Sequence, residues 1–132
     1  MTPVHLGIST CPNDTFAFHA ILKKKIDLRG LEFRVELLDV DELNKRLLRG
    51  AFDVAKASFY AAMSLGSEVG VLPAGSALGF GVGPLLLAAR PDTHPRHWKS
   101  GSERPQARVL CPGEKTTATL LYHLFHTGEG DI

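Results

Sequence analysis

The stretch "PVHLGISTCPNDTF", residues 3–16, contains the pattern that decides the fold. Its first half alternates apolar side chains with other residues, which is the period-two pattern of a β-strand. Its second half supplies the polar residues of a helix start, and "TFAFHAILKKK", residues 15–25, predicts the helix that follows. A strand therefore leads into a helix through a short turn that is unusually rich in polar groups.

The rest of the chain repeats this alternation. Further strands are predicted at residues 31–40, 52–58, 69–75, 82–90 and 107–111. Further helices are predicted after Asp39 or Asp41, after Ser58 and from Thr116 onward, and residues 91–106 are predicted to form a polar loop. Strands that alternate with helices favour an α/β fold with a mainly parallel sheet flanked by helices.

Composition limits the class of protein. The chain of 132 residues is 44% hydrophobic and 22% charged, which fits one globular domain. A net charge of +1 gives nucleic acid no electrostatic footprint, so no nucleic-acid partner is expected. The longest apolar run, residues 84–89, is too short to cross a bilayer, so no membrane partner is expected. Because the first residues lack a secretory pattern and the two cysteines form no disulfide framework, we expect a cytoplasmic location.

Three strand–helix junctions share one arrangement. "STCPNDTF", "KASFYA" and "VLCPGEKTTA" each place polar residues between a predicted strand and a predicted helix. The carboxyl ends of parallel strands meet at one edge of a sheet, where ligands bind, and helix N-termini there favour a carboxylate or phosphate. We therefore expect Asp14, Ser58 and Thr116 to line one anion-binding cleft. The alternative for each residue is that it only caps its helix.

Other chemical motifs are incomplete. The glycine-rich residues 79–83 do not match a dinucleotide-binding motif, and no serine lies in a hydrolase elbow. The pairs His94/His97 and His123/His126 lack a third ligand, so no metal and no cofactor are expected.

The two cysteines, Cys11 and Cys111, lie beside predicted helix starts, where a thiol pKa can be lowered. We expect both to be small buried residues, and a nucleophilic role is the less favoured alternative.

Five segments in order give the chain its family resemblance. These are "LGISTCPNDTF", "LLDVDELNKRLLRG", "FDVAKASFYA", "AGSALGFGVGPLLLA" and "CPGEKTTATLL". Together they resemble the 1,4-dihydroxy-6-naphthoate synthases, enzymes of menaquinone biosynthesis by the futalosine pathway, from about Leu6 to Phe125. The resemblance implies a two-lobed fold like that of type II periplasmic binding proteins, with the substrate between the lobes. It also implies a lyase that breaks a carbon–carbon bond in cyclic dehypoxanthine futalosine to release 1,4-dihydroxy-6-naphthoate.

The resemblance also implies a set of substrate-binding residues. They are Lys56, Ala57, Ser58, Thr116, Thr117, Asn44 and Asp14. The family's catalytic base is a histidine in the second-lobe part of the chain, so it is expected beyond Ile132. None of the six histidines here inherits the role, and no catalytic residue is assigned within the chain. Phe80 and Ser76 depart from the residues common in relatives.

Residues 1–132 are accordingly expected to form the first lobe of a truncated two-lobed enzyme. Its implied partners are a small carboxylate substrate and the missing second lobe, and the chain alone is expected to be inactive. An apolar patch should be exposed where missing segments would pack. One alternative is a non-catalytic binding module for small carboxylate-bearing solutes, and another is a truncated remnant without activity.

Overall fold

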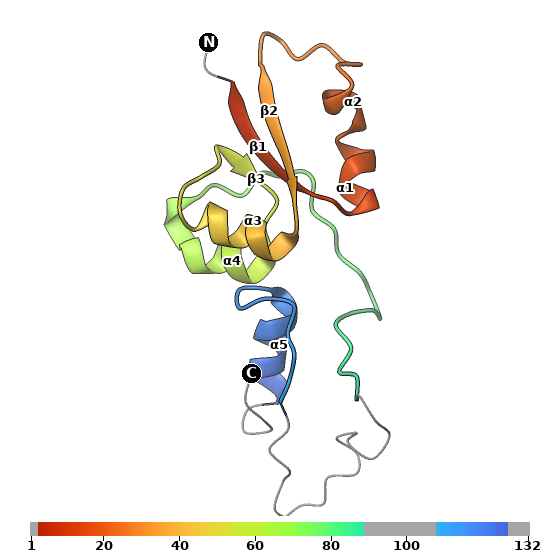
Figure 1. Ribbon diagram of the computed structural model, residues 1–132, viewed down its shortest axis with the longest axis vertical. Coiled ribbons are helices and arrows are strands. Elements are labelled where there is room, and N and C mark those ends of the chain that lie inside the picture. Colours follow the sequence, from red (N-terminus) through yellow and green to blue (C-terminus); the bar gives the residue numbers. More distant parts are fainter. Residues whose placement is uncertain (1–2, 89–107, 127–132) are drawn as a thin grey trace, which may run out of the picture.

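A small parallel sheet forms the centre of the fold. The computed structural model describes residues 3–88 and 108–126. Three parallel strands, β1 (Val4–Ser9), β2 (Phe33–Leu38) and β3 (Val54–Ala55), lie in the order β2-β1-β3 (Figure 1). The α/β class and the parallel sheet expected from the sequence are therefore confirmed.

Helices flank this sheet in the described part of the chain. They are α1 (Pro12–Ala17), α2 (His19–Leu22), α3 (Val40–Leu47), α4 (Phe59–Leu65), the 3₁₀ turn η1 (Gly66–Glu68) and α5 (Thr117–Phe125). Both α1 and α3 pack against β1, whereas α5 packs against α4 at the end of the molecule away from α2 (Figure 1). Asp39, Ser58 and Thr116 cap α3, α4 and α5 through their side chains, as the sequence predicts.

The sheet faces explain the composition of β1. Leu6 and Ile8 lie opposite Val35 and Leu37 of β2, so these alternate residues form one apolar face. On the other face, a Cβ at Gly7 would lie 2.8 Å from Cδ2 of Leu43 and 3.0 Å from the Phe52 ring. Any other residue there would force the side chain of Leu43 or the ring of Phe52 to shift, because α3 and the Phe52 loop approach the strand closely. The buried apolar residues are Leu6, Ile8, Leu43, Phe52, Ala61, Leu65 and Tyr122.

The helix predicted over residues 15–25 is wrong in its extent. Helical structure begins earlier, at Pro12, and breaks at Phe18, where φ is −90° and ψ is 2°. It ends at Leu22, before the three lysines that were expected to complete it. Lys24 has a φ of 51°, and a residue in this left-handed region ends a helix.

Three predicted strands are not strands in the structure. Residues 69–75 and 82–88 carry no strand, and residues 108–111 contribute none to the sheet; the remainder of the predicted strands and the loop over 91–106 lie outside the described residues. The physical reason is that an apolar run becomes a strand only when another strand satisfies its backbone. Within the described chain no partner strand lies beside residues 69–75 or 82–88, and residues 108–111 contribute only a single β-bridge at Arg108.

Many apolar side chains of this region face solvent. In the segment from residue 71 to residue 87, which we call the apolar segment, the exposed large side chains are Val71, Leu72, Leu78, Phe80, Val82, Leu85, Leu86 and Leu87. Phe59 and Met63 of α4 and Leu124 and Phe125 of α5 are exposed as well. Exposed apolar side chains are therefore found in the described chain, along the apolar segment and on α4 and α5. Among the described residues, no helix has the length and apolar character needed to cross a membrane.

Candidate functional site

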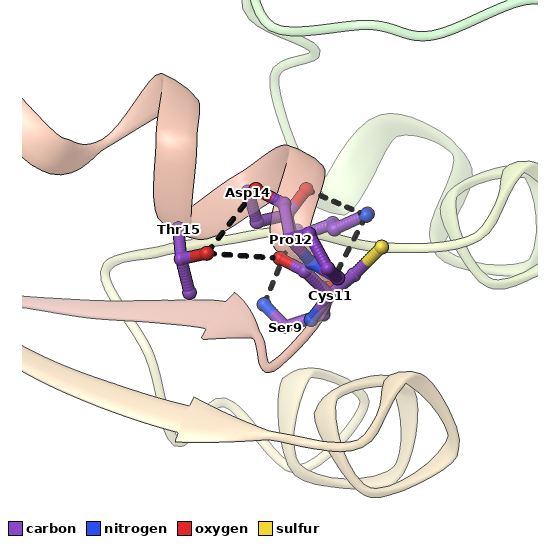
Figure 2. Close-up of polar contacts among 6 residues, drawn as sticks. Ser9, Cys11, Pro12, Asp14 and Thr15 are labelled. Carbon is purple, nitrogen blue, oxygen red and sulfur yellow. Dashed lines mark hydrogen bonds and ion pairs between the residues drawn. The ribbon is translucent and has the colours of Figure 1, made fainter.

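Asp14 joins the first strand–helix junction to the third strand. Its Oδ2 accepts a hydrogen bond from the Ser9 backbone N–H at 2.9 Å, which folds the turn after β1 back on itself (Figure 2). Its Oδ1 lies 2.7 Å from Nζ of Lys56, just after β3, and the same ammonium lies 3.4 Å from Oγ of Ser9. The ion pair therefore fixes the Lys56 side chain at the carboxyl edge of the sheet.

Electrostatics keep Asp14 ionised. Burial alone raises the pKa of Asp14, but hydrogen bonds from Lys56 and Ser9 outweigh it, so the pKa is lowered from its ordinary value of 3.8. The Lys56 side chain remains 38% exposed. An ammonium has three N–H donors, and Asp14 and Ser9 take two of them. One donor of Lys56 is left for a ligand on the open side.

A buried amide links three helices near this edge. Asn44 of α3 donates from Nδ2 to Oγ of Ser58 at 3.2 Å and to the Lys115 carbonyl at 3.3 Å. Its Oδ1 accepts from the Ser58 backbone N–H at 3.0 Å. Oγ of Ser58 in turn donates to the Lys115 carbonyl at 2.5 Å and accepts from the Ala61 N–H. We call the three residues Asn44, Ser58 and Lys115 the amide bridge.

Thr116 is turned inward at the start of α5. Its hydroxyl donates to the Gly113 carbonyl at 2.9 Å and lies 3.0 Å from the hydroxyl of Thr119. Both threonines are buried. The Thr116 side chain therefore shapes the turn before α5 and caps that helix.

Ala57 and Thr117 each carry a polar group that no other residue in the described part of the chain binds. Within the described residues, neither the Ala57 backbone N–H nor the Thr117 hydroxyl has a hydrogen-bond partner. Thr117 is the first residue of α5, where backbone N–H groups lack helical acceptors. The Lys115 ammonium lies 4.9 Å from the centre of the Tyr60 ring on α4.

These contacts bring together the three junctions that were expected to meet. The Asp14–Lys56 pair joins the first to the second, and the bond from Ser58 to Lys115 joins the second to the third. The three junctions are thus in contact, but the expectation that a strand leads into the third junction is wrong. Residues 108–116 reach the site as an irregular segment.

The capping alternative is correct for two of the three residues. Ser58 and Thr116 cap their helices, and Ser58 makes its further bonds within the amide bridge. Asp14 does not cap α1, whose N-cap residue Cys11 makes no side-chain cap bond. Ser9 and Lys115 were not predicted from the sequence as site residues. Ser9 could have been found as the last residue of the strand, whereas Lys115 acts through a carbonyl that every residue carries.

The remaining reactive side chains form no second centre. Among the described residues no group of three metal-ligating side chains occurs, and His94 and His97 lie outside this range. The ring of Tyr122 stacks on His126. Cys11 is exposed, so the expectation that it is buried is wrong, and Cys111 is half-buried. An open hollow of about 420 Å³ is lined by Phe16, Ala17, His19 and Ala20, which include none of the predicted site residues.

Comparisons with known proteins agree with one another. A family model described as menaquinone biosynthesis matches residues 4–131. A 1,4-dihydroxy-6-naphthoate synthase of Thermus thermophilus is 34% identical over 128 residues, which are 97% of this chain and 43% of the relative. A synthase of the same name from Streptomyces coelicolor is 33% identical over 92% of this chain and 40% of the relative. The chain thus spans less than half the length of these relatives. No solved structure matches it significantly.

Proposed function

The chain belongs to the menaquinone biosynthesis family, and from that premise we propose that it forms one wall of a 1,4-dihydroxy-6-naphthoate synthase site. The complete enzyme would be a lyase that converts cyclic dehypoxanthine futalosine to 1,4-dihydroxy-6-naphthoate. The observation that carries the proposal is the meeting of three junctions at one sheet edge, joined by Asp14–Lys56 and by the amide bridge.

Free donors define the direct contacts of this wall. Lys56, Ala57 and Thr117 keep N–H or O–H groups that no other described residue uses. Charge-assisted bonds from an ammonium are the stronger ones, so Lys56 would hold the substrate carboxylate or another electron-rich oxygen. Thr117 would bind a second polar group from the α5 side. We assign ground-state binding to these three residues.

The other expected binding residues would act as the frame of the wall. Asp14 orients the Lys56 ammonium. The polar side-chain groups of Asn44, Ser58 and Thr116 form their hydrogen bonds at the starts of α4 and α5. A direct substrate bond from the Ser58 hydroxyl would require it to leave the Lys115 carbonyl. These residues therefore line the site chiefly by fixing its shape.

The reaction requires a further part of the polypeptide. We propose that the catalytic base is a histidine in a second lobe, and that the two lobes form a fold like that of type II periplasmic binding proteins. General acid–base catalysis needs the base within hydrogen-bond reach of the proton that it removes. The exposed apolar segment supports such a neighbour, because a large apolar surface favours contact with another protein surface. The chain alone would bind but not turn over.

Binding of the product tests this assignment. The fluorescence of 1,4-dihydroxy-6-naphthoate can be titrated with the chain and with the variants Lys56→Met and Thr117→Val. We expect each variant to weaken binding about tenfold or more, since each removes a polar contact to the ligand. Lys45→Met is the matched control, because it removes the same charge from an exposed lysine of α3 that pairs with Asp41.

The outcomes separate site binding from general attraction. Equal weakening by Lys56→Met and Lys45→Met would mean that only net charge matters, and the proposed site would be wrong. Binding that persists unchanged in both site variants would also contradict it. Equally tight binding of unrelated small carboxylates would favour the non-catalytic solute-binding module.

A further inference from the structure

We propose that Asn44 is a positioning residue: its buried amide sets the spacing between the starts of α4 and α5, and thereby between the free donors of Ala57 and Thr117. This inference rests on the proposed function, because it concerns the same site. It assigns Asn44 a role that differs from direct substrate contact.

The amide group of Asn44 suits this role because it can both donate and accept hydrogen bonds. Asn44 offers one acceptor and two donor positions, and the structure uses the acceptor for the Ser58 N–H and the donors for Ser58 Oγ and the Lys115 carbonyl. Asn44 is only 1% exposed. One buried side chain from α3 therefore holds both helix starts.

The Ser58 hydroxyl completes the link. A hydroxyl has one donor and two acceptor positions, and here the donor goes to the Lys115 carbonyl while the acceptors receive Asn44 Nδ2 and the Ala61 N–H. All three positions are occupied, so the hydroxyl has no freedom to rotate to another partner. The α4 start and the Lys115 carbonyl thus have one mutual arrangement.

The bonds of the bridge end beside the proposed ligand contacts. Ser58 directly follows Ala57, and Lys115 precedes Thr117 by two residues. A small core gains more from an apolar side chain than from a buried amide, unless the amide's hydrogen bonds fix something else. What the amide of Asn44 fixes is the geometry across the two sides of the site.

The test compares two Asn44 variants with a matched control on the same helix. Asn44→Ala removes every bond of the amide. Asn44→Asp keeps the acceptor for the Ser58 N–H but directs a carboxylate oxygen at the Lys115 carbonyl. Leu43→Ala is the control, since Leu43 is fully buried next to Asn44 and packs on β1 instead. Amide hydrogen exchange and binding of 1,4-dihydroxy-6-naphthoate are measured at conditions where all variants have equal global stability.

We expect the two Asn44 variants to change amide exchange in a pattern that a general loss of stability does not produce. Asn44→Ala should speed exchange at two amides by about tenfold relative to Leu43→Ala. The Ser58 amide loses its acceptor, and the Thr119 amide donates to Oγ of Thr116, which follows the Lys115 carbonyl that Asn44 holds. Asn44→Asp should speed exchange at Thr119 while Ser58 stays protected. Both Asn44 variants should weaken naphthoate binding about tenfold, and Leu43→Ala should not.

Each contrary result has a distinct meaning. If Asn44→Asp exposes both amides equally, or if Leu43→Ala matches Asn44→Ala in exchange, Asn44 is only a core residue and the inference is overturned. If exchange splits as expected but naphthoate binding is unchanged, the positioning role is overturned while the proposed function stands. If the unsubstituted chain binds no naphthoate, the proposed function fails, and the positioning role in binding fails with it.

Discussion

The Asp14 carboxylate shows how one side chain can serve both the fold and the site. It accepts a bond from the end of β1 and forms an ion pair with Lys56 after β3, so it ties two strand ends together. Its lowered pKa means that the ionised form is the one the folded state favours. Stability and ligand orientation therefore depend on the same charge.

Replacing Asp14 should lower stability in a pH-dependent way. Asp14→Asn leaves Lys56 without its counter-charge, and we expect the free energy of unfolding at pH 7 to fall by about 1–2 kcal/mol. Because the folded pKa is below the unfolded value, the contribution of Asp14 is complete above about pH 4 and is lost as pH falls through the folded pKa. Urea unfolding at a series of pH values measures this difference.

The control for Asp14 is Glu32→Gln, which removes a negative charge from an exposed residue. Its unfolding free energy should stay within about 0.5 kcal/mol of the unsubstituted chain. A difference between Asp14→Asn and the unsubstituted chain that persists undiminished at pH 2 would contradict the account.

Substitutions at Ser58 and Thr117 should differ in their effect on the free energy of unfolding. Ser58→Ala removes a helix cap and two bonds of the amide bridge, so we expect a loss of about 1–3 kcal/mol in unfolding free energy. Thr117→Val removes a hydroxyl that has no partner in the described chain, so stability should change by less than about 0.5 kcal/mol. Thermal and urea unfolding measure both. A large loss of stability in Thr117→Val would mean that its hydroxyl has an internal role.

At the scale of elements, local signals predicted the helices better than the strands. Ser58 and Thr116 were identified as helix starts, and Asp39 as one of two candidates with Asp41, because capping is a property of a few neighbouring residues. Strands β1 and β2 were also found, since each has a clear alternating pattern and pairs with the other. The apolar runs over 69–75 and 82–88 did not become strands, because a strand depends on a neighbour that its own residues do not encode.

The candidate site could likewise be predicted from the sequence only in part. The meeting of the first two junctions followed from the rule that parallel strands end at one edge, whereas the third junction joins them without a strand before it. The internal bonds of Asn44 and Ser58 could not be predicted, because they depend on a carbonyl of Lys115 that lies 71 residues from Asn44 and 57 from Ser58.

The contact between α3 and the sheet makes a prediction at Gly7. Gly7→Ala would place a methyl group 2.8 Å from Leu43 and 3.0 Å from Phe52, so α3 or the ring must move. We expect a loss of about 1–3 kcal/mol in unfolding free energy. Gly70→Ala is the control, since nothing lies within 4 Å of its added carbon, and it should leave stability nearly unchanged. Equal effects of the two substitutions would contradict the close packing of α3 on β1.

The whole molecule combines a small core with a long apolar segment. Among residues 3–88 and 108–126, seven apolar residues are buried, whereas the side chains of Phe80 and Leu85 are 89% and 79% exposed. Such a surface favours association with itself or with another polypeptide. The relatives, of which this chain spans less than half, place more polypeptide in the same protein.

The exposed segment should make the isolated chain associate. Sedimentation velocity should show concentration-dependent association, and the double substitution Leu85→Gln with Leu87→Gln should shift the chain toward monomer. Ile26→Gln is the control, because it alters an exposed apolar side chain outside this segment. A chain that is monomeric at all concentrations and has a sharp thermal unfolding transition would show that the apolar segment does not have to be buried against another polypeptide.

The central claim is that this chain supplies one wall of a naphthoate synthase site and lacks its catalytic base. The most direct measurement is release of 1,4-dihydroxy-6-naphthoate from cyclic dehypoxanthine futalosine, followed by chromatography. The assay compares the chain alone with the chain mixed with the non-matching remainder of the Thermus thermophilus relative. The account predicts no turnover by either part alone, and turnover by the mixture that Lys56→Met reduces at least about tenfold. Robust turnover by the chain alone would place the base within these residues, with His19 and His123 the first to substitute, and would contradict the account.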